Sequence, residues 1–516
     1  MFTSLDAYVG ISDFFYIVSI LFLTSFIVFL VTSIKFRYPL LLDFTTNCSI
    51  LILIYLFFLV INNPWSEVIT FNNMFMLDNH SLFLKLLLII SSICVLSMSK
   101  DYFKYSKINK FEYPILILLS LEGMFLLVTS YDLFTMYLAL ELQSLCFYIL
   151  ATFKRYSESS TEAGLKYFVL GSIASGILLY GISLVYGITG STNFEDIFKL
   201  LSCSNITLQE ASSSYSILEN SFPFSNFISK FMQIDFAFKS LSVGLIFILV
   251  AFLFKLAVAP FHMWSPDVYE GSPTSTTLVF SILSKIAISG TMVRLYSYLF
   301  SNFYFLLDDL FIWSCCLSIL IGSISALYQQ NIKRFIAFTS ISHVGFLLLA
   351  LIGNTEESLY SFYFYLIIYC FMFFSFFSII YSMNKKTGNY ATLLKDFNHL
   401  SIINKPLAIA FSIILFSLAG VPPMAGFFSK YFILLGGAKI SYYLVIFIGL
   451  SIGSISSFYY VRIIKDMFFN TLESKFVFPI YYKTSYVNAF IISSTCIFLT
   501  IGIFFLYYLN LINFII

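Results

Sequence analysis

Charged and polar side chains lie inside stretches of this sequence that are otherwise apolar enough for a membrane. Lys255 and Lys285 stand in successive apolar runs, Lys430 stands in a third, and Glu141 and His343 stand in two more. An ionisable group inside a membrane is costly and marks an ion or proton pathway by default. Amines, carboxylates and imidazoles all gain and lose protons, so these residues are candidates for a proton relay, although a lone histidine is often only a structural donor.

Prolines interrupt two of the lysine-bearing runs. Pro260 closely follows Lys255, and Pro422 and Pro423 closely precede Lys430. Proline lacks a backbone donor and clashes with the preceding turn, so each site predicts two half-helices with free backbone groups between them. After Pro260 we expect a polar hairpin before the next apolar run. Free backbone groups at membrane depth are tolerated only against protein or a wet cavity.

Other charges within apolar runs have a structural interpretation beside the functional one. Lys166 lies four residues after Glu162, the spacing of a helical ion pair. Lys85 and Arg294 are expected to be structural, with Lys85 near a span end where a long side chain reaches the interface. Glu122 could hydrogen-bond a neighbouring helix. Buried ion pairs kept for packing alone are often neutral or worse for stability, which favours a functional role for Lys255, Lys285, Lys430 and Glu141.

The composition is that of a polytopic membrane protein. Hydrophobic residues make up 59% of the 516 residues and charged residues 10%, whereas soluble domains have roughly 45–50% apolar residues. A net charge of +2 gives no reason to expect a nucleic-acid partner. The eight cysteines show no spacing typical of zinc or iron–sulfur sites. We therefore expect no metal and no cofactor in this chain.

Fourteen apolar runs approach or exceed the roughly 20 residues that cross a bilayer. We predict spans at 14–34, 46–61, 80–98, 112–129, 131–152, 162–188, 240–263, 272–298, 303–326, 331–352, 358–383, 403–434, 440–467 and 485–511. Lys and Arg should gather in alternate loops if the count is right. One side holds 18 of the 28, the other holds 4, and six lie within spans. This sorting favours both termini on the positive-poor side.

The spans group into units without any soluble domain. We divide the chain into an N-terminal three-helix segment (1–110), a first five-span unit (111–300), a second five-span unit (301–470) and a C-terminal span (471–516), and expect a long loop at 190–239. The interrupted spans, the seventh and twelfth, hold corresponding positions, and an odd number of spans inverts one unit relative to the other. The predicted fold is all-α, with two inverted five-helix repeats and two broken helices.

Several segments together resemble one protein family. The runs FKLAVAPFHMWSPDVYEGSPTSTTLVFSILSKIAI, QQNIKRFIAFTSISHVGF, AGVPPMAGFFSKYFIL, YLALELQSLCFYILA and TEAGLKYFVLGSIASGILLYG are similar to the subunit 2 type of NADH dehydrogenase, an antiporter-like, proton-translocating subunit of respiratory complex I. The resemblance covers most of residues 110–470. The related subunit 4 type would carry a glutamate in place of Lys430. Glu122 departs from the family, where we expect a small or apolar residue.

The resemblance implies a role for each candidate residue: a charged pair of Glu141 and Lys255, a central relay at Lys285, a link at His343, a terminal site at Lys430, and Lys166 beside the pair. Desolvation disfavours the charged form of a buried lysine and a nearby carboxylate restores it. Neutralising the carboxylate would therefore release the proton of its partner lysine. The NAD, FMN and iron–sulfur clusters of the redox reaction would belong to partner subunits.

The resemblance also implies partners and a membrane. The partners would be neighbouring subunits of the 4 and 4L types and lipids, with ubiquinone reached only through the complex. Abundant Phe, Ile, Tyr, Asn and Lys favour an AT-rich organelle genome, so we expect the mitochondrial inner membrane, with both termini on the intermembrane-space side, rather than a bacterial plasma membrane. Two other functions stay open: a subunit of a monovalent cation/proton antiporter, and a purely structural membrane subunit.

Overall fold

The structure is a computed structural model that describes residues 38–62, 67–106, 110–200, 224–300, 304–352, 355–383, 391–439, 442–469 and 484–506. The first predicted span, 14–34, lies outside these residues. Each of the other thirteen predicted spans has a helical counterpart in the described part of the chain.

Helices make up most of the described chain. They are α2 (Tyr38–Ile61), α3 (Asn79–Ser106), α4 (Glu112–Thr129), α5 (Leu133–Ala151), α6 (Glu158–Thr189), α8 (Phe224–Leu256), α9 (Trp264–Gly271), α10 (Thr274–Tyr298), α11 (Tyr304–Leu327), α12 (Ile332–Leu351), α13 (Glu356–Ser382), α14 (Leu400–Ile403), α15 (Lys405–Ala419), α16 (Ala425–Lys439), α17 (Tyr443–Phe468) and α18 (Tyr486–Leu506). A 3-10 turn, η2, covers Leu394–Phe397. One antiparallel hairpin pairs β1 (Val68–Thr70) with β2 (Phe75–Leu77).

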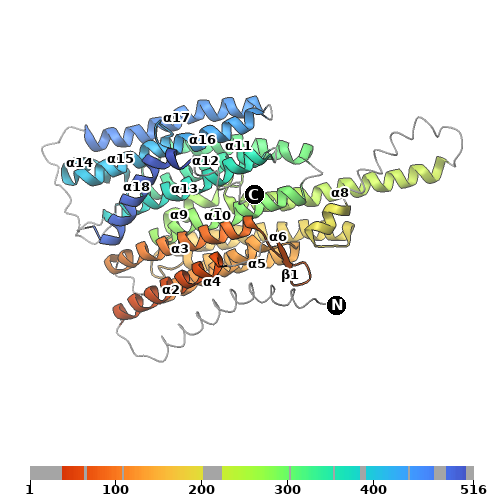
Figure 1. Ribbon diagram of the computed structural model, residues 1–516, viewed down its shortest axis with the longest axis horizontal. Helices are drawn as coiled ribbons and strands as arrows, with labels where there is room; N and C mark the ends of the chain where they lie inside the picture. Colours follow the sequence, from red (N-terminus) through yellow and green to blue (C-terminus); the bar gives the residue numbers. More distant parts are fainter. Residues whose placement is uncertain are drawn as a thin grey trace.

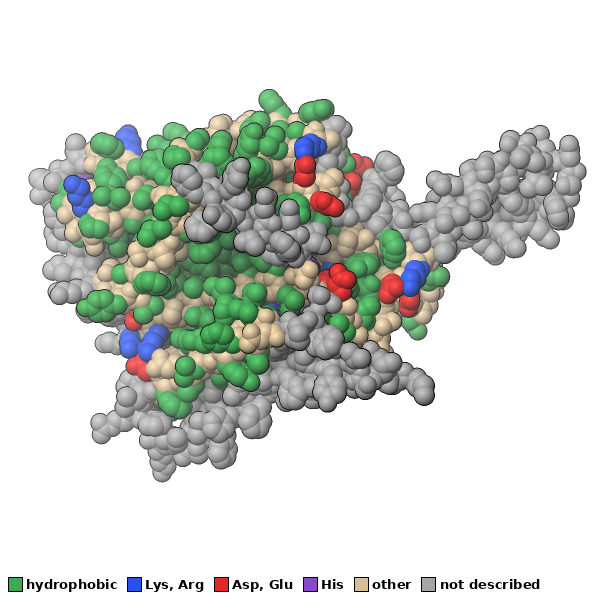
Figure 2. All heavy atoms as spheres, viewed as in Figure 1, with side chains coloured by type: hydrophobic (Ala, Val, Ile, Leu, Met, Phe, Trp, Pro, Cys, Tyr) green, Lys and Arg blue, Asp and Glu red, His purple; other side chains and the backbone are tan. Residues whose placement is uncertain are grey.

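The described helices are those of an integral membrane protein. Ten of them are long and apolar enough to cross a membrane, and three shorter apolar segments lie at Ser240–Leu256, Lys405–Ala419 and Tyr486–Gly502. Figure 2 shows hydrophobic side chains over the middle of one face and charged side chains gathered toward its two ends. A bilayer requires this distribution, because its core excludes charge and its surfaces do not.

The ends of the helices agree with the predicted sorting of loops. At one end, β2 pairs with Ser130, and Asp132 pairs with Asn193, so three loops predicted on the positive-poor side meet. At the other end, Lys100 and Lys104 approach Asp43. These residues lie at two further loops that are predicted to share a side. We keep the names positive-poor and positive-rich for these two ends.

The structure differs from three expectations about the elements. Helix α2 begins at Tyr38 rather than at residue 46, and α8 begins at Phe224, inside the predicted loop 190–239. Apolar residues recur at three- and four-residue intervals in the first part of α8, which is the pattern of an amphipathic helix. The expected polar hairpin after Pro260 is the short helix α9, which buries Trp264 and Val268 one turn apart on one face.

The most buried helices occupy the centre of the bundle. In the membrane-length window of each helix, every residue of α10 is buried and 89% of α12 and of α13 are, against 39% of α6 and 33% of α17. Figure 1 shows α2 to α6 (red to yellow) on one side, α15 to α17 (blue) on the other, and α9, α10, α12 and α13 between them. The central helices carry Lys285 and His343, which therefore face protein rather than lipid.

Candidate functional site

Lys285 binds the carbonyl group that Pro260 leaves free. In a continuous helix, the Leu256 carbonyl would accept a hydrogen bond from the N–H four residues later, but that residue is a proline and has none. Helix α8 ends at Leu256, and the Lys285 Nζ, from the fully buried α10, donates to the Leu256 oxygen. The C-terminus of a helix carries partial negative charge, which stabilises an ammonium there.

Lys430 repeats this arrangement at the second break. Pro422 and Pro423 remove the donors that the carbonyls of Leu418 and Ala419 would have met at the end of α15. The Lys430 Nζ, on the following half-helix α16, donates to both, at 2.8 Å from the Leu418 oxygen and 3.2 Å from the Ala419 oxygen. Both predicted helix breaks thus hold a lysine on carbonyls freed by proline.

Lys255 has no such anchor. It lies in the last turn of α8, 8% exposed, and its Nζ has no hydrogen-bond partner. Glu141, in the middle of α5, attracts it through space, but no direct ion pair within 4 Å joins these two described residues. One Glu141 oxygen lies 3.4 Å from the Ser144 hydroxyl and the other has no partner. The structure places Glu141 and Lys255 near each other as a loose, electrostatically coupled pair.

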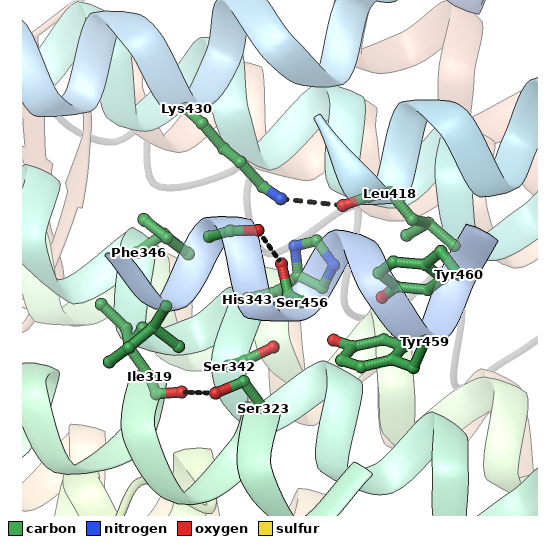
Figure 3. Close-up of a pocket in the computed structure, with 12 residues that line it drawn as sticks. Ile319, Ser323, Ser342, His343, Phe346, Leu418, Lys430, Ser456, Tyr459 and Tyr460 are labelled. Carbon is green, nitrogen blue, oxygen red and sulfur yellow. Dashed lines mark hydrogen bonds between the residues drawn. The ribbon is translucent and has the colours of Figure 1, made fainter. Parts of the chain in front are cut away.

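His343 and Lys430 share a small cavity. The cavity has a volume of about 10 Å³, which is room for roughly one water molecule. Lys430 enters it from α16, and His343 enters from α12 beside the hydroxyls of Ser342, Ser456 and neighbouring tyrosines (Figure 3). A water molecule there would have several polar partners, so the two predicted relay residues can exchange a proton through it.

Two tyrosines that sequence reasoning missed fill the gap between Lys285 and His343. Tyr365 of α13 holds the His343 Nδ1 with its hydroxyl, 2.6 Å away. One turn further along α13, the Tyr369 hydroxyl donates to the Ser281 carbonyl at 2.7 Å, and its ring lies against the His343 ring. Ser281 is one turn from Lys285 on α10. The only indication in the sequence was two tyrosines four residues apart in a very apolar span.

Removing the Tyr365 hydroxyl should slow proton transfer without disturbing packing. Tyr365→Phe keeps the buried ring and leaves His343 with one fewer partner, which costs about 1 kcal/mol for a lost neutral hydrogen bond. We expect coupled turnover to fall by a factor of about five, the rate equivalent of 1 kcal/mol in a barrier. Steady-state activity per assembled complex measures this. Tyr431→Phe, on the half-exposed side of α16, is the matched control. An equal loss of activity in both variants would mean that the Tyr365 hydroxyl has no specific role in proton transfer.

Lys166 does not join the Glu141–Lys255 pair. Its Nζ lies 2.8 Å from Glu162 and 3.1 Å from Asp267 of α9, at the positive-rich end. Arg334, in the first turn of α12, binds Asp267 and Glu270 on the same half-helix. These ion pairs tie α9 to α6 and to α12. The interpretation of Lys166 as a member of an i,i+4 pair is thus confirmed, and Lys166 also positions α9.

Three other charged residues take different positions. Lys85 is 4% exposed within α3, so the expectation that it reaches the interface was wrong, because α3 is packed on several sides. Arg294 forms a buried ion pair with Asp78. Glu122 is buried in α4, and one of its carboxyl oxygens has no partner. Among the described residues, no group of three His, Cys, Asp or Glu is arranged to hold a metal ion.

Comparisons with known proteins match this chain to one family. The family model described as NADH:quinone oxidoreductase/Mrp antiporter, transmembrane, matches residues 130–456. The chain is 38% identical to NADH-ubiquinone oxidoreductase chain 2 of Marchantia polymorpha, over 92% of this chain and 90% of that protein. It is 40% identical to NADH-quinone oxidoreductase subunit N of Pelagibacter ubique (strain HTCC1062), over 80% of each.

Solved structures share the fold. A chain of respiratory complex I from Thermus thermophilus with bound aureothin superposes with a TM-score of 0.73 at 24% identity, covering 94% of this chain and 96% of that one. A chain of the Mrp complex from Dietzia sp. DQ12-45-1b superposes with a TM-score of 0.70 at 20% identity, covering 94% and 82%.

Proposed function

The chain belongs to the NADH:quinone oxidoreductase/Mrp antiporter family, and from this premise we propose that its buried lysines carry protons across the membrane. Its relatives of the chain 2 and subunit N type are subunits of NADH:quinone oxidoreductase, a proton-translocating enzyme. The chain has the same function, as an antiporter-like membrane subunit of that enzyme. The relay itself is our proposal.

The proposed relay follows the central helices. It begins at the loose pair of Glu141 and Lys255 and continues to Lys285, whose ammonium contacts the residue next to Lys255. Tyr369 and Tyr365 then lead along α13 to His343, and the shared cavity leads from His343 to Lys430. From Lys285 to Lys430, each step crosses one hydrogen bond, one helical turn or the space of one water molecule.

The contacts of each lysine indicate how a proton would move. Lys255 has lost its water shell and gained no hydrogen bond, so its charged form depends on the field of Glu141. Protonating or displacing Glu141 removes that field, and the Lys255 proton is then released toward Lys285. Lys285 and Lys430 are each held by backbone carbonyls, which accept hydrogen bonds from an amine or an ammonium. Both can therefore change charge without losing their position.

The anchoring of Lys285 and Lys430 on proline-freed carbonyls carries this proposal. A purely structural cap would not need a charge: an asparagine or glutamine donates to a carbonyl as well, without the cost of burying an ammonium. A lysine binds the freed carbonyls at both helix breaks, at the end of α8 and at the end of α15. The presence of an ionisable donor at both places favours proton exchange. The corresponding breaks also support the division into two inverted repeats that the sequence analysis predicts.

The proposal also covers the neighbouring subunits and the membrane. We infer neighbours of the subunit 4 and 4L types, redox cofactors (NAD, FMN, iron–sulfur clusters) in partner subunits, and the mitochondrial inner membrane with both termini on the intermembrane-space side. A cation/proton antiporter subunit is the second candidate function, because the Mrp chain shares the fold.

Purifying the native complex distinguishes the two functions. We expect the chain to co-purify with subunits that contain flavin and iron–sulfur clusters, and the complex to reduce quinone with NADH while moving protons. A complex without redox cofactors that exchanges monovalent cations for protons would establish the antiporter function instead.

A further inference from the structure

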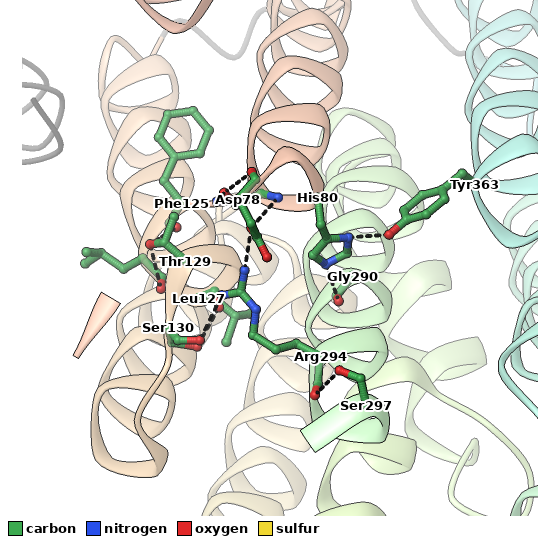
Figure 4. Close-up of polar contacts among 12 residues, drawn as sticks. Asp78, His80, Phe125, Leu127, Thr129, Ser130, Gly290, Arg294, Ser297 and Tyr363 are labelled. Carbon is green, nitrogen blue, oxygen red and sulfur yellow. Dashed lines mark hydrogen bonds and ion pairs between the residues drawn. The ribbon is translucent and has the colours of Figure 1, made fainter. Parts of the chain in front are cut away.

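A second cluster of buried polar groups lies apart from the proposed relay (Figure 4). The Arg294 guanidinium, near the end of α10, donates to Asp78 at 2.7 Å and to the Ser130 carbonyl at 3.0 Å. His80, in the first turn of α3, contacts the Tyr363 hydroxyl of α13 through Nδ1 and the Gly290 carbonyl of α10 through Nε2, the latter at 3.0 Å. Three helices, α3, α10 and α13, thus meet at one imidazole.

The ion pair accounts for Arg294 and Asp78 but not for His80. Burial alone would raise the pKa of the Asp78 carboxyl, but Arg294, His80 and hydrogen bonding from Ser81 lower it to about 2. Asp78 therefore stays ionised at any physiological pH and balances Arg294. Neither group needs an imidazole to complete its contacts. His80 is the member of the cluster whose ring can both accept and donate a proton through its hydrogen bonds.

The hydrogen bonds of His80 define a proton-transfer unit. A carbonyl only accepts, so Nε2 must donate to Gly290, and in the neutral ring Nδ1 accepts the Tyr363 hydroxyl proton. If Nδ1 gains a proton, it becomes a donor and Tyr363 becomes the acceptor. The Tyr363 O–H then points to another acceptor, such as water. The phenol can pass its own proton to that water and take the Nδ1 proton in exchange, so that one proton leaves and the His80 ring is neutral again.

Water can reach this unit from the positive-poor end. A cavity of about 240 Å³ is lined by Glu67, Asp78, His80, Arg294, Ser297, Tyr298 and Tyr363, among others. It lies where α3 and α13 begin and α10 ends, the end at which the loops around Ser130 and Asn193 meet. A polar space of this size holds several water molecules. The charged and titratable groups facing His80 are Asp78, Arg294, Tyr363 and, across the cavity, Glu67 and Tyr298.

The cavity brings water close to the level of the central lysine. His80 contacts α10 at Gly290, five residues after Lys285, which is about 7.5 Å along the helix axis. The two positions differ by about 140° around α10, so transfer between them requires an intervening polar group. The buried Ser289 lies between them on the same helix.

We propose that His80 and Tyr363 form a second proton-exchange site, which releases protons from the central part of the relay to the positive-poor side. This inference depends on the proposed relay through Lys285. The outlet would act in parallel with Lys430, with Tyr363 and the Gly290 carbonyl holding the imidazole between α3, α10 and α13.

The test compares proton release by the native complex in proteoliposomes, per assembled complex. The variants are His80→Asn, Tyr363→Phe, Lys430→Gln and each of the first two combined with Lys430→Gln, with Ser297→Ala on the cavity wall as the control. Two parallel outlets predict that the residual rates of His80→Asn and Lys430→Gln add up to the wild-type rate, and that the double variant releases almost none. In Lys430→Gln alone, the residual rate should fall as the positive-poor compartment is acidified.

Several outcomes would overturn the outlet. A double variant that releases protons as fast as Lys430→Gln alone, or no residual release in Lys430→Gln, means that the cluster carries no flux. If His80→Asn does not assemble, Tyr363→Phe decides, because it removes one hydroxyl and keeps the ring that packs on Phe83. Wild-type release in Lys285→Gln would instead reject the relay itself, so the two failures are distinguishable.

Discussion

Replacing Lys285 by glutamine abolishes coupled turnover while the complex still assembles. Glutamine keeps an N–H donor for the Leu256 carbonyl that Lys285 binds, but its amide does not take up or release a proton in the physiological range. We expect quinone-linked NADH oxidation to fall by at least about 100-fold, as general acid–base groups typically contribute 10²–10⁴-fold. The rate per assembled complex, with assembly followed by native gel electrophoresis, measures this.

Lys285→Met separates the structural part of this effect. Methionine fills similar space but leaves a buried carbonyl without a donor, at a cost of about 1–3 kcal/mol. The Met variant should therefore be as inactive as the Gln variant and also less stable, seen as a lower yield of assembled complex. Substantial activity in the Gln variant together with poor assembly of the Met variant would mean that Lys285 is only a cap for α8.

Glu141→Gln has the second largest expected effect. It removes the charge that supports the ammonium of Lys255 at nearly constant shape, and Lys255 has no hydrogen bond to compensate. Without that charge, the balance of the buried Lys255 shifts toward its neutral form. We expect NADH oxidation and proton pumping to fall together by about 10-fold or more.

Glu141→Asp is the matched control for that change. It keeps the charge and shortens the side chain by one methylene. Because Glu141 acts through space rather than through a direct ion pair, a shift of this size should leave most of the attraction, so the Asp variant should be intermediate. Equal activities in wild type, Gln and Asp variants would show that Glu141 is a packing residue.

Local features of the helix breaks could be predicted, but their contacts could not. A proline interrupts a helix because it removes the N–H that would bond the carbonyl four residues earlier. Both breaks, at Pro260 and at Pro422 and Pro423, occur as expected. Which side chain takes the freed carbonyls depends on distant helices: Lys285 reaches Leu256 from 29 residues away in the sequence. No spacing rule within one helix indicates such a pairing.

Sequence reasoning was weakest where polarity and burial disagree. Lys85 was expected to reach the interface from near a span end, yet it is buried. The role of Tyr365 could not be predicted, because nothing in its own apolar helix indicates that its hydroxyl meets His343 of another helix. In the sequence, the polar residues Asp267 and Glu270 favour a hairpin, whereas the structure forms the helix α9 with Trp264 and Val268 buried.

Protons moved per electron test the relay most directly. The native complex would be reconstituted into proteoliposomes, and the ratio measured from NADH oxidation and the initial pH change, for wild type and for Lys430→Gln, which keeps an amide donor for the carbonyls of Leu418 and Ala419. The relay through the chain predicts a lower ratio in the Lys430→Gln variant, or loss of both activities together. An unchanged ratio at the wild-type rate would contradict it.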